Sequence, residues 1–325
     1  KDEKASDVKR LNFITLVLCL MIGTAALPHI LMRYYTTPSV QEARQSVFWS
    51  LFCIFLLYFS APALAVLVKF DIYHFLVGTQ FTDLPAWAAA WSKVDPTLLR
   101  IDDINKDGIV QLAEITLGQD IVVLATPEIA GLPYVISGLV AAGGLAAALS
   151  TADGLLLTIA NALSHDVYYK MIDPTASTQR RVTISKFLLL GVAIVAAYVT
   201  SLKPGDILFL VGAAFSLAAS AFFPALVLGV FWKRANKPGA IAGMVTGLGI
   251  CCYYMGTRYP FFQKMFGFNP TDYPLWFDIQ PISSGIFGLS VGIVALVVVS
   301  LLTKEPDQET QELVEHVRYP NLKQA

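Results

Sequence analysis

Hydroxyl and carboxylate side chains interrupt an apolar stretch of the sequence at residues 133–170. The stretch is long enough to cross a bilayer as one helix. Its middle carries Ser150, Thr151 and Asp153, where a lipid-facing helix would carry leucine or isoleucine. Polar groups at this depth are costly unless they are paired or bind something. The stretch therefore predicts an ion or solute site at mid-membrane depth.

Helical spacing gathers the polar and small residues of this stretch on one side. At 100° per residue, that side holds Gly143, Gly144, Ala147, Ser150, Thr151, Gly154, Thr158 and Asn161. Small residues let another backbone approach closely, and the hydroxyls and the amide can hold a polar ligand. A packing helix whose hydroxyls bond back to its own carbonyls is the alternative interpretation.

A second candidate site lies in DINKDGIVQLAE, residues 103–114. Its spacing matches the twelve-residue calcium loop of EF-hands, which surrounds a hard cation with six to eight oxygens. Gly108 occupies the position of the sharp turn. The expected ligands are the side chains of Asp103, Asn105, Asp107 and Glu114 and the carbonyl of Ile109. A solvated acidic turn is the alternative.

The first apolar span, residues 11–32, is expected to be broken within GTAALPHIL, residues 23–31. Gly23 permits unusual backbone torsions, and Pro28 cannot donate the helical hydrogen bond. Such a break persists in a membrane only inside protein or beside a wet cavity, and broken spans mark binding sites in many transporters. A simple proline kink is the alternative. His29 fits a packing role better than an ion ligand.

Composition sets the class of protein that must position these residues. Of the 325 residues, 55% are hydrophobic and only 14% are charged, against about 25% charged in an average soluble domain. A net charge of −1 excludes a strongly basic nucleic-acid binder. The four cysteines lie in apolar segments at spacings that suit neither a zinc site nor a disulfide framework. We expect an all-α membrane protein that crosses the bilayer several times.

The apolar segments predict about seven spans. They cover approximately residues 11–32, 47–69, 133–170, 184–202, 206–232, 239–257 and 282–303. A charged stretch at 1–10 precedes them, residues 70–130 form the longest non-spanning part, and 304–325 form a polar tail.

Basic residues predict the orientation. Three clusters, at residues 33–44, 170–186 and 233–237, fall on one side of the predicted spans and outnumber those of the opposite loops. The richer side is expected to be cytoplasmic. Residues 1–10 and 70–130 would then lie outside and the tail inside. An outside location suits a calcium loop, because extracellular modules can use weak sites where calcium is abundant.

Three segments together resemble the sodium/solute symporter family, in its acetate-permease-like branch. They are GTAALPHILMRYYTTPSVQEARQSVF, ALSTADGLLLTIANALSHDVY and AASAFFPALVLGVFWKRANKPGAIAGM, and the resemblance covers about residues 11–300 except the calcium-like loop. It implies a fold of two inverted five-helix repeats plus accessory helices. This chain would be the C-terminal half, from the sixth core helix onward, and would need an N-terminal portion to complete the transporter.

The resemblance also implies roles for individual residues. It assigns the coupling sodium ion to the hydroxyls of Ser150 and Thr151 and the carbonyl of Ala147. Neutral hydroxyl and carbonyl oxygens suit this hard ion. The residues expected to line the solute are Gly23, Thr24, Ala25, Phe215 and Ser216, with His29 nearby.

Asp153 departs from the family pattern, because acetate permease as aligned lacks the STADG run. Three roles stay open for this carboxylate: a second cation ligand, a proton acceptor, or a hydrogen-bonded brace. The departure weakens the transfer of acetate as the substrate.

The expected function is sodium-driven import of a small organic solute, with a monocarboxylate such as acetate as the candidate. The protein would span the plasma membrane, in bacteria the inner membrane, in contact with lipid. No covalent chemistry is expected. The alternatives are a transporter-like solute sensor that signals through a partner, an amino-acid or sugar symporter, and a channel. A short tail disfavours the sensor, and the presence of only one strongly polar span disfavours the channel.

Overall fold

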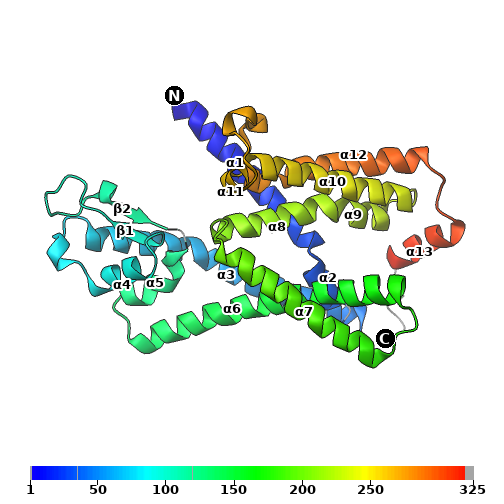
Figure 1. Ribbon diagram of the computed structural model, residues 1–325, viewed down its shortest axis with the longest axis horizontal. Helices are drawn as coiled ribbons and strands as arrows, with labels where there is room; N and C mark the ends of the chain where they lie inside the picture. Colours follow the sequence, from blue (N-terminus) through cyan, green and yellow to red (C-terminus); the bar gives the residue numbers. More distant parts are fainter. Residues whose placement is uncertain (1, 35, 119, 319–325) are drawn as a thin grey trace. The chain divides into compact units, whose positions relative to one another are not determined.

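A computed structural model describes residues 2–34, 36–118 and 120–318 (Figure 1). The end of the predicted tail, residues 319–325, lies outside this description. Within it, seven helices are long and apolar enough to cross a membrane. The predicted all-α membrane fold with about seven spans is therefore confirmed. The chain divides into two compact units, one formed by Lys1–Ala43 with Asn161–Ala325 and the other by Arg44–Ala160.

The first unit is helical. Its elements are α1 (Asp2–Ala26), α2 (Pro28–Tyr34), η3 (Ala162–Ile172), α7 (Thr178–Ser201), α8 (Ile207–Ala221), α9 (Phe223–Phe231), α10 (Lys237–Arg258), α11 (Pro260–Phe266), α12 (Gly285–Leu302) and α13 (Gln308–Arg318), with the short turns η4 (Pro270–Asp272), η5 (Trp276–Asp278) and η6 (Pro281–Ser283). Helices α8, α10 and α12 pack against one another, and α1 packs on α8.

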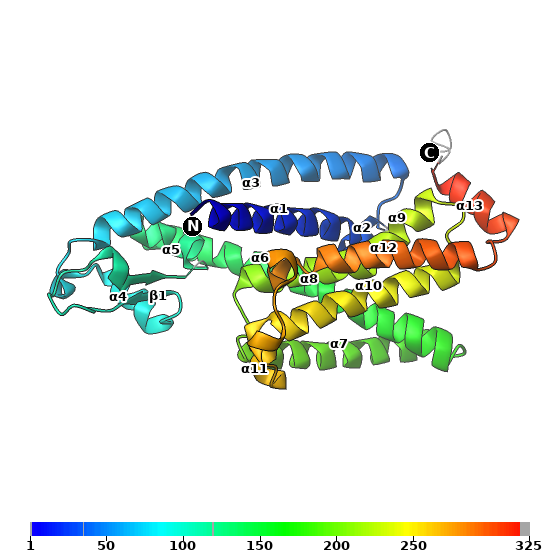
Figure 2. The ribbon, with the colours of Figure 1, turned by 90° about the horizontal axis from the view of Figure 1, so that it is seen from above.

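Helices α10 and α12 run side by side at close range (Figure 2). Glycines four residues apart allow this approach: a Cβ atom at Gly243 would lie 2.8 Å from the carbonyl oxygen of Gly292, and one at Gly247 would lie 2.9 Å from that of Gly288. Helices in lipid associate through such small-residue contacts because the bilayer offers no hydrophobic drive for their association. The glycines therefore determine which faces of these spans meet.

Polar residues define where the spans begin. The side chain of Asn236 accepts a hydrogen bond from the backbone N–H of Gly239 at 2.9 Å and donates to the hydroxyl of Thr303 at 2.7 Å. The first interaction caps α10, and the second joins its start to the end of α12. Ser177 caps α7 through the N–H of Arg180.

The second unit contains α3 (Val40–Leu76), η1 (Phe81–Asp83), α4 (Ala86–Val94), β1 (Leu99–Ile101), η2 (Leu112–Glu114), β2 (Ile115–Leu117), α5 (Ile121–Ile129) and α6 (Tyr134–Asn161). At 1.5 Å per residue, the 37 residues of α3 extend over about 55 Å, which is longer than the hydrocarbon core of a bilayer. The predicted non-spanning stretch is a folded domain built on the end of this helix.

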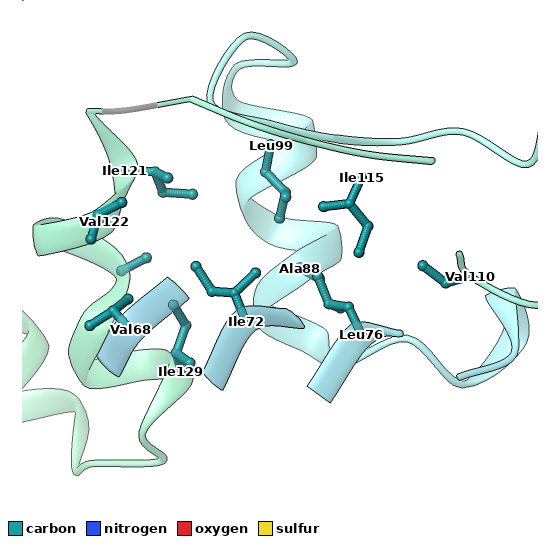
Figure 3. Packing of buried hydrophobic residues seen from close by; sticks show 11 residues of the cluster. Val68, Ile72, Leu76, Ala88, Leu99, Val110, Ile115, Ile121, Val122 and Ile129 are labelled. Atoms are coloured by element: carbon teal, nitrogen blue, oxygen red, sulfur yellow. The ribbon is translucent and has the colours of Figure 1, made fainter. Parts of the chain in front are cut away.

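Buried apolar side chains from five elements form the core of this domain (Figure 3). Strands β1 and β2 pair antiparallel with Leu99 opposite Leu117, and Leu99 points into the core. Helix α3 contributes Ile72 and Leu76, both fully buried. Val110, from the calcium-like loop, is 1% exposed and joins the same cluster. The loop is thereby anchored to the domain by an apolar residue of its own.

Candidate functional site

The predicted sodium ligands lie on one continuous helix, α6. Ala147, Ser150 and Thr151 are all exposed, and none of the apolar window of this span is buried. The hydroxyl of Thr151 donates to the carbonyl oxygen of Ala147 at 3.2 Å. Back-bonding of this kind is the packing alternative, and it is present here. It leaves the hydroxyl oxygen of Thr151 and a second lone pair of the carbonyl available to a cation.

The oxygens of Ala147, Ser150 and Thr151 can supply only part of a cation site, because sodium needs further oxygen ligands around it. Asp153, two residues beyond Thr151, is also exposed. It forms no ion pair among the described residues.

The backbone of the first span departs from a regular helix at Leu27, not at Gly23. Helix α1 continues through Gly23 to Ala26, and α2 begins at Pro28. Gly23 is buried against α8: a Cβ atom there would lie 2.5 Å from the carbonyl oxygen of Phe215. Gly23 therefore permits close contact between two helices, and any larger residue would push α8 away.

The other residues expected to line the solute differ in their surroundings. Thr24 and Ala25 are exposed, and the hydroxyl of Thr24 donates to the carbonyl of Leu20 at 2.6 Å. His29 is half-buried, and its Nδ1 atom is buried without a hydrogen-bond partner among the described residues. This orphaned nitrogen is a polar group that a ligand could satisfy.

On α8, Phe215 and Ser216 lie in packed surroundings. Phe215 packs against the buried pair Ala26 and Leu27, which brings it next to the break in the first span. Ser216 is fully buried, and its hydroxyl donates to the carbonyl oxygen of Ile282 at 2.7 Å. This hydrogen bond joins α8 to η6, the turn before α12, and gives Ser216 a structural role.

The calcium-like loop is organised by its carboxylates. Asp103 Oδ2 accepts from the N–H of Gly108 at 3.2 Å, and Asp107 Oδ1 accepts from the N–H of Ile109 at 2.8 Å. Gly108 has φ +76°, the left-handed region that glycine adopts freely. Glu114 is 4% exposed, and its two oxygens accept from the backbone N–H groups of Ile104, Asn105 and Gln111.

These contacts bear on whether the loop suits a cation. Asp103 Oδ1 is buried and has no hydrogen-bond partner in the described part of the chain. The donor set consists of carboxylate, amide and carbonyl oxygens, which calcium prefers. Among the described residues, no group of three or more His, Cys, Asp or Glu side chains lies close enough together to hold a metal ion. The types of donor suit calcium, but their arrangement in the described part of the chain is not that of a metal site.

One polar cluster, around Arg258, was not predicted from the sequence. The expected site residues do not include Arg258, yet this residue is only 7% exposed and its guanidinium lies over the rings of Tyr254 and Trp276. An arginine directly after an apolar span and followed by a loop rich in aromatic residues was the available signal.

The apolar helices define a multi-pass, all-α membrane protein. Residues 116–247 match the model of the sodium:solute symporter family. An uncharacterized symporter of Cupriavidus necator is 61% identical over 316 residues, which cover 97% of this chain and 46% of that protein. A monocarboxylic acid transporter of Corynebacterium glutamicum is 31% identical over 241 residues, 74% of this chain and 37% of that protein.

These matches confirm the predicted relationship to the sodium:solute symporter family, and the second relative fits its acetate-permease-like branch. Members of this family are transporters, not enzymes. The chain spans about half the length or less of the two curated relatives. The matched segment begins at strand β2 and runs into α10, so it contains the whole of α6.

Proposed function

We propose that the chain is part of a sodium-coupled symporter that imports a small organic solute, with a monocarboxylate such as acetate as the first candidate. The observation that carries this proposal is the hydroxyl face of α6. Ser150 and Thr151 lie within the segment that matches the symporter family, and no described residue buries them. Sodium would be held by both hydroxyls and by the carbonyl of Ala147.

The rest of the protein would complete this site. The matched regions cover 46% of one relative and 37% of the other, and an inverted-repeat transporter places its ion site between two repeats. We therefore propose that the missing cation ligands come from an N-terminal half of the transporter, outside the part that this chain spans. Lipid would cover the leucine-rich side of α6, which carries Leu145, Leu149 and Leu155.

The solute would lie beside the break in the first span. Thr24 and Ala25 are exposed there, and the unpartnered Nδ1 of His29 offers a polar contact. Gly23 and Phe215 would support this region by bringing α1 and α8 together, and Ser216 would hold α8 in place. Asp153 could serve as a second cation ligand or a proton acceptor.

Uptake measurements on the full-length protein test the proposal. Proteoliposomes would receive radiolabelled acetate, propionate, alanine and glucose, each with an inward sodium gradient or with choline in its place. We expect uptake of a monocarboxylate that requires sodium. Sodium-dependent uptake of alanine or glucose alone would indicate an amino-acid or sugar symporter, and binding without uptake would favour a sensor.

A calcium ion is the second proposed ligand. The spacing of Asp103, Asn105, Asp107, the carbonyl of Ile109 and Glu114 motivates it, together with the buried, unpartnered Asp103 Oδ1. With the plasma membrane of a bacterium as the location, this loop would lie outside, where the cation would order it. Saturable terbium luminescence on the purified protein, displaced by calcium, is the expected result. Absence of saturable binding up to about 10 mM calcium would reduce the loop to an acidic turn.

A further inference from the structure

A hollow of about 600 Å³ lies in the first unit where α8 begins and α10 ends. The start of α8 contributes Phe209, the end of α10 contributes Arg258, and the following segments contribute Tyr259, Tyr273 and Ile282. Binding sites for small organic molecules have volumes of about 300–1,000 Å³ and are lined mainly by apolar and aromatic side chains, with a few polar groups. The polar residues of the lining are Arg258, Gln263 and Gln280, besides the two tyrosines.

Arg258 is a buried cation with no carboxylate partner among the described residues. Its Nε donates to the carbonyl oxygen of Pro274 at 2.8 Å, and its Nη1 donates to the hydroxyl of Thr257 at 2.7 Å. The ion pairs of the described residues do not include it. The guanidinium carbon lies 4.4 Å from the ring centroid of Tyr254 and 4.7 Å from that of Trp276.

These contacts offset only part of the free-energy cost of burying the charge of Arg258. A buried guanidinium costs free energy unless it is paired, and cation–π contacts offset part of that cost. The two hydrogen bonds use two of the five N–H groups of arginine, so donors remain for another acceptor. A guanidinium presents its N–H groups in a planar fork that matches a carboxylate with two parallel hydrogen bonds.

We propose that this hollow binds an organic monocarboxylate, with the carboxylate on Arg258 and the hydrocarbon body against Phe209, Tyr259 and Ile282. The role of the hollow in uptake, as the place where the solute is first captured, rests on the proposed function. Anion binding itself does not, because it requires no sodium.

Tyr259 contributes a neutral phenol to the wall of the hollow. Burial, with the Asp206 carboxylate adding to it, raises the pKa of this phenol. Its hydroxyl donates to the carbonyl oxygen of Pro204 at 3.0 Å. Tyr259 therefore adds an aromatic ring to this wall and no charge of its own.

The position of Trp276 over the guanidinium provides a direct readout. Purified full-length protein in sodium-free choline buffer would be titrated with butyrate, and with butyramide as the neutral molecule of similar shape. We expect a saturable change in tryptophan fluorescence with butyrate alone, absent in Trp276→Phe. A response equal for both molecules, or none, overturns the proposal whatever the uptake assay shows.

Substitutions of Arg258 distinguish a role in ligand binding from a structural role in supporting the loop after α10. Arg258→Lys keeps the charge and the apolar stem but not the fork, and Arg258→Gln removes the charge. We expect at least a threefold loss of butyrate affinity in the first and at least a tenfold loss in the second. Lys264→Gln, an exposed cation on α11, is the matched control and should bind as the wild type does. Wild-type affinity in a folded Arg258→Lys protein would assign Arg258 a structural role only.

Discussion

At the scale of single residues, Ser150 and Thr151 place two hydroxyl oxygens on α6 within one helical turn of the Ala147 carbonyl. The hydrogen bond from Thr151 to Ala147 shows that the packing interpretation and the ion-binding interpretation use the same atoms. A cation at this site would use the free lone pairs of these two oxygens, so the hydrogen bond and the ion are compatible. The sodium dependence of uptake distinguishes the two interpretations.

The double substitution Ser150→Ala with Thr151→Ala should lower the apparent sodium affinity of uptake at least tenfold, or about 1.4 kcal/mol. The reason is the loss of two of the oxygens proposed to surround the ion. Initial uptake rates against sodium concentration would measure it in the full-length protein. Thr200→Ala is the control, since it removes a hydroxyl on α7 whose one hydrogen bond within the described residues goes to the carbonyl of Ala196. Equal sodium dependence in the double variant and the control would refute the assignment.

Within the calcium-like loop, Glu114→Gln should weaken terbium binding more than any other single change, by at least tenfold. Glu114 is the residue expected to contribute two oxygens at once, and Asp103→Ala should rank second. Luminescence titration of purified variants gives the order. Asp83→Asn, an exposed carboxylate on the neighbouring turn η1, serves as the control. A ranking with Asp83 above Glu114 would mean that terbium reports surface charge.

The pKa of Asp107 indicates how this binding should depend on pH. A hydrogen bond from the N–H of Ile109, with further bonds from Asn105 and Gln111, lowers that pKa below its ordinary value. The carboxylate therefore stays charged as the pH falls through the ordinary range of aspartate, and it is lost as a ligand only below its lowered pKa.

At the scale of elements, the contact between α10 and α12 depends on glycine. Gly247→Ala should destabilise the purified protein by about 1–3 kcal/mol, because the added methyl group would overlap backbone oxygens of α8 and α12. Gly249→Ala on the same helix is the matched control, since a Cβ atom there has no neighbour within 4 Å among the described residues. Thermal unfolding in detergent, followed by size-exclusion chromatography, measures both. Equal midpoints for the two variants would contradict the close packing.

The calcium-like loop is joined to the end of α3 by backbone hydrogen bonds. Gly78 donates to Val110, Val110 donates to Thr79, and Phe81 donates to Gly108. If the cation orders the loop, chelation should speed hydrogen exchange over residues 102–114 at least tenfold, because its three carboxylates would then repel one another. Exchange in α10 and α12 should stay unchanged. Uniform acceleration across all helices would instead indicate general destabilisation by the chelator.

At the scale of the whole molecule, the distribution of basic residues predicts the orientation in the membrane. The loop at 103–114 should be accessible from outside intact cells, and the tail should not. A cysteine introduced at Lys106, which is exposed, should react with an impermeant maleimide, whereas one at Glu309 should react only after permeabilisation. Replacing the exposed native Cys53 and Cys252 removes background labelling. The opposite labelling pattern would invert the topology.

The sequence by itself determined the class of protein and the spacing of the candidate ligands. Span length, hydropathy and the pattern of the calcium-like loop are local properties, because each depends on residues close together along the chain. Helical periodicity likewise sufficed to place Ser150 and Thr151 on one face of α6. These features follow from backbone geometry alone and need no knowledge of distant partners.

Only the tertiary structure decided the role of residues whose partners are distant in sequence. Gly23 contacts Phe215, the hydroxyl of Ser216 bonds to Ile282, and Arg258 is buried beneath Trp276. Periodicity cannot predict such contacts, since the same glycine or serine serves equally as a hinge, a ligand or a packing residue. Close packing of small residues selects which helix faces meet, and that choice depends on the fit of whole surfaces.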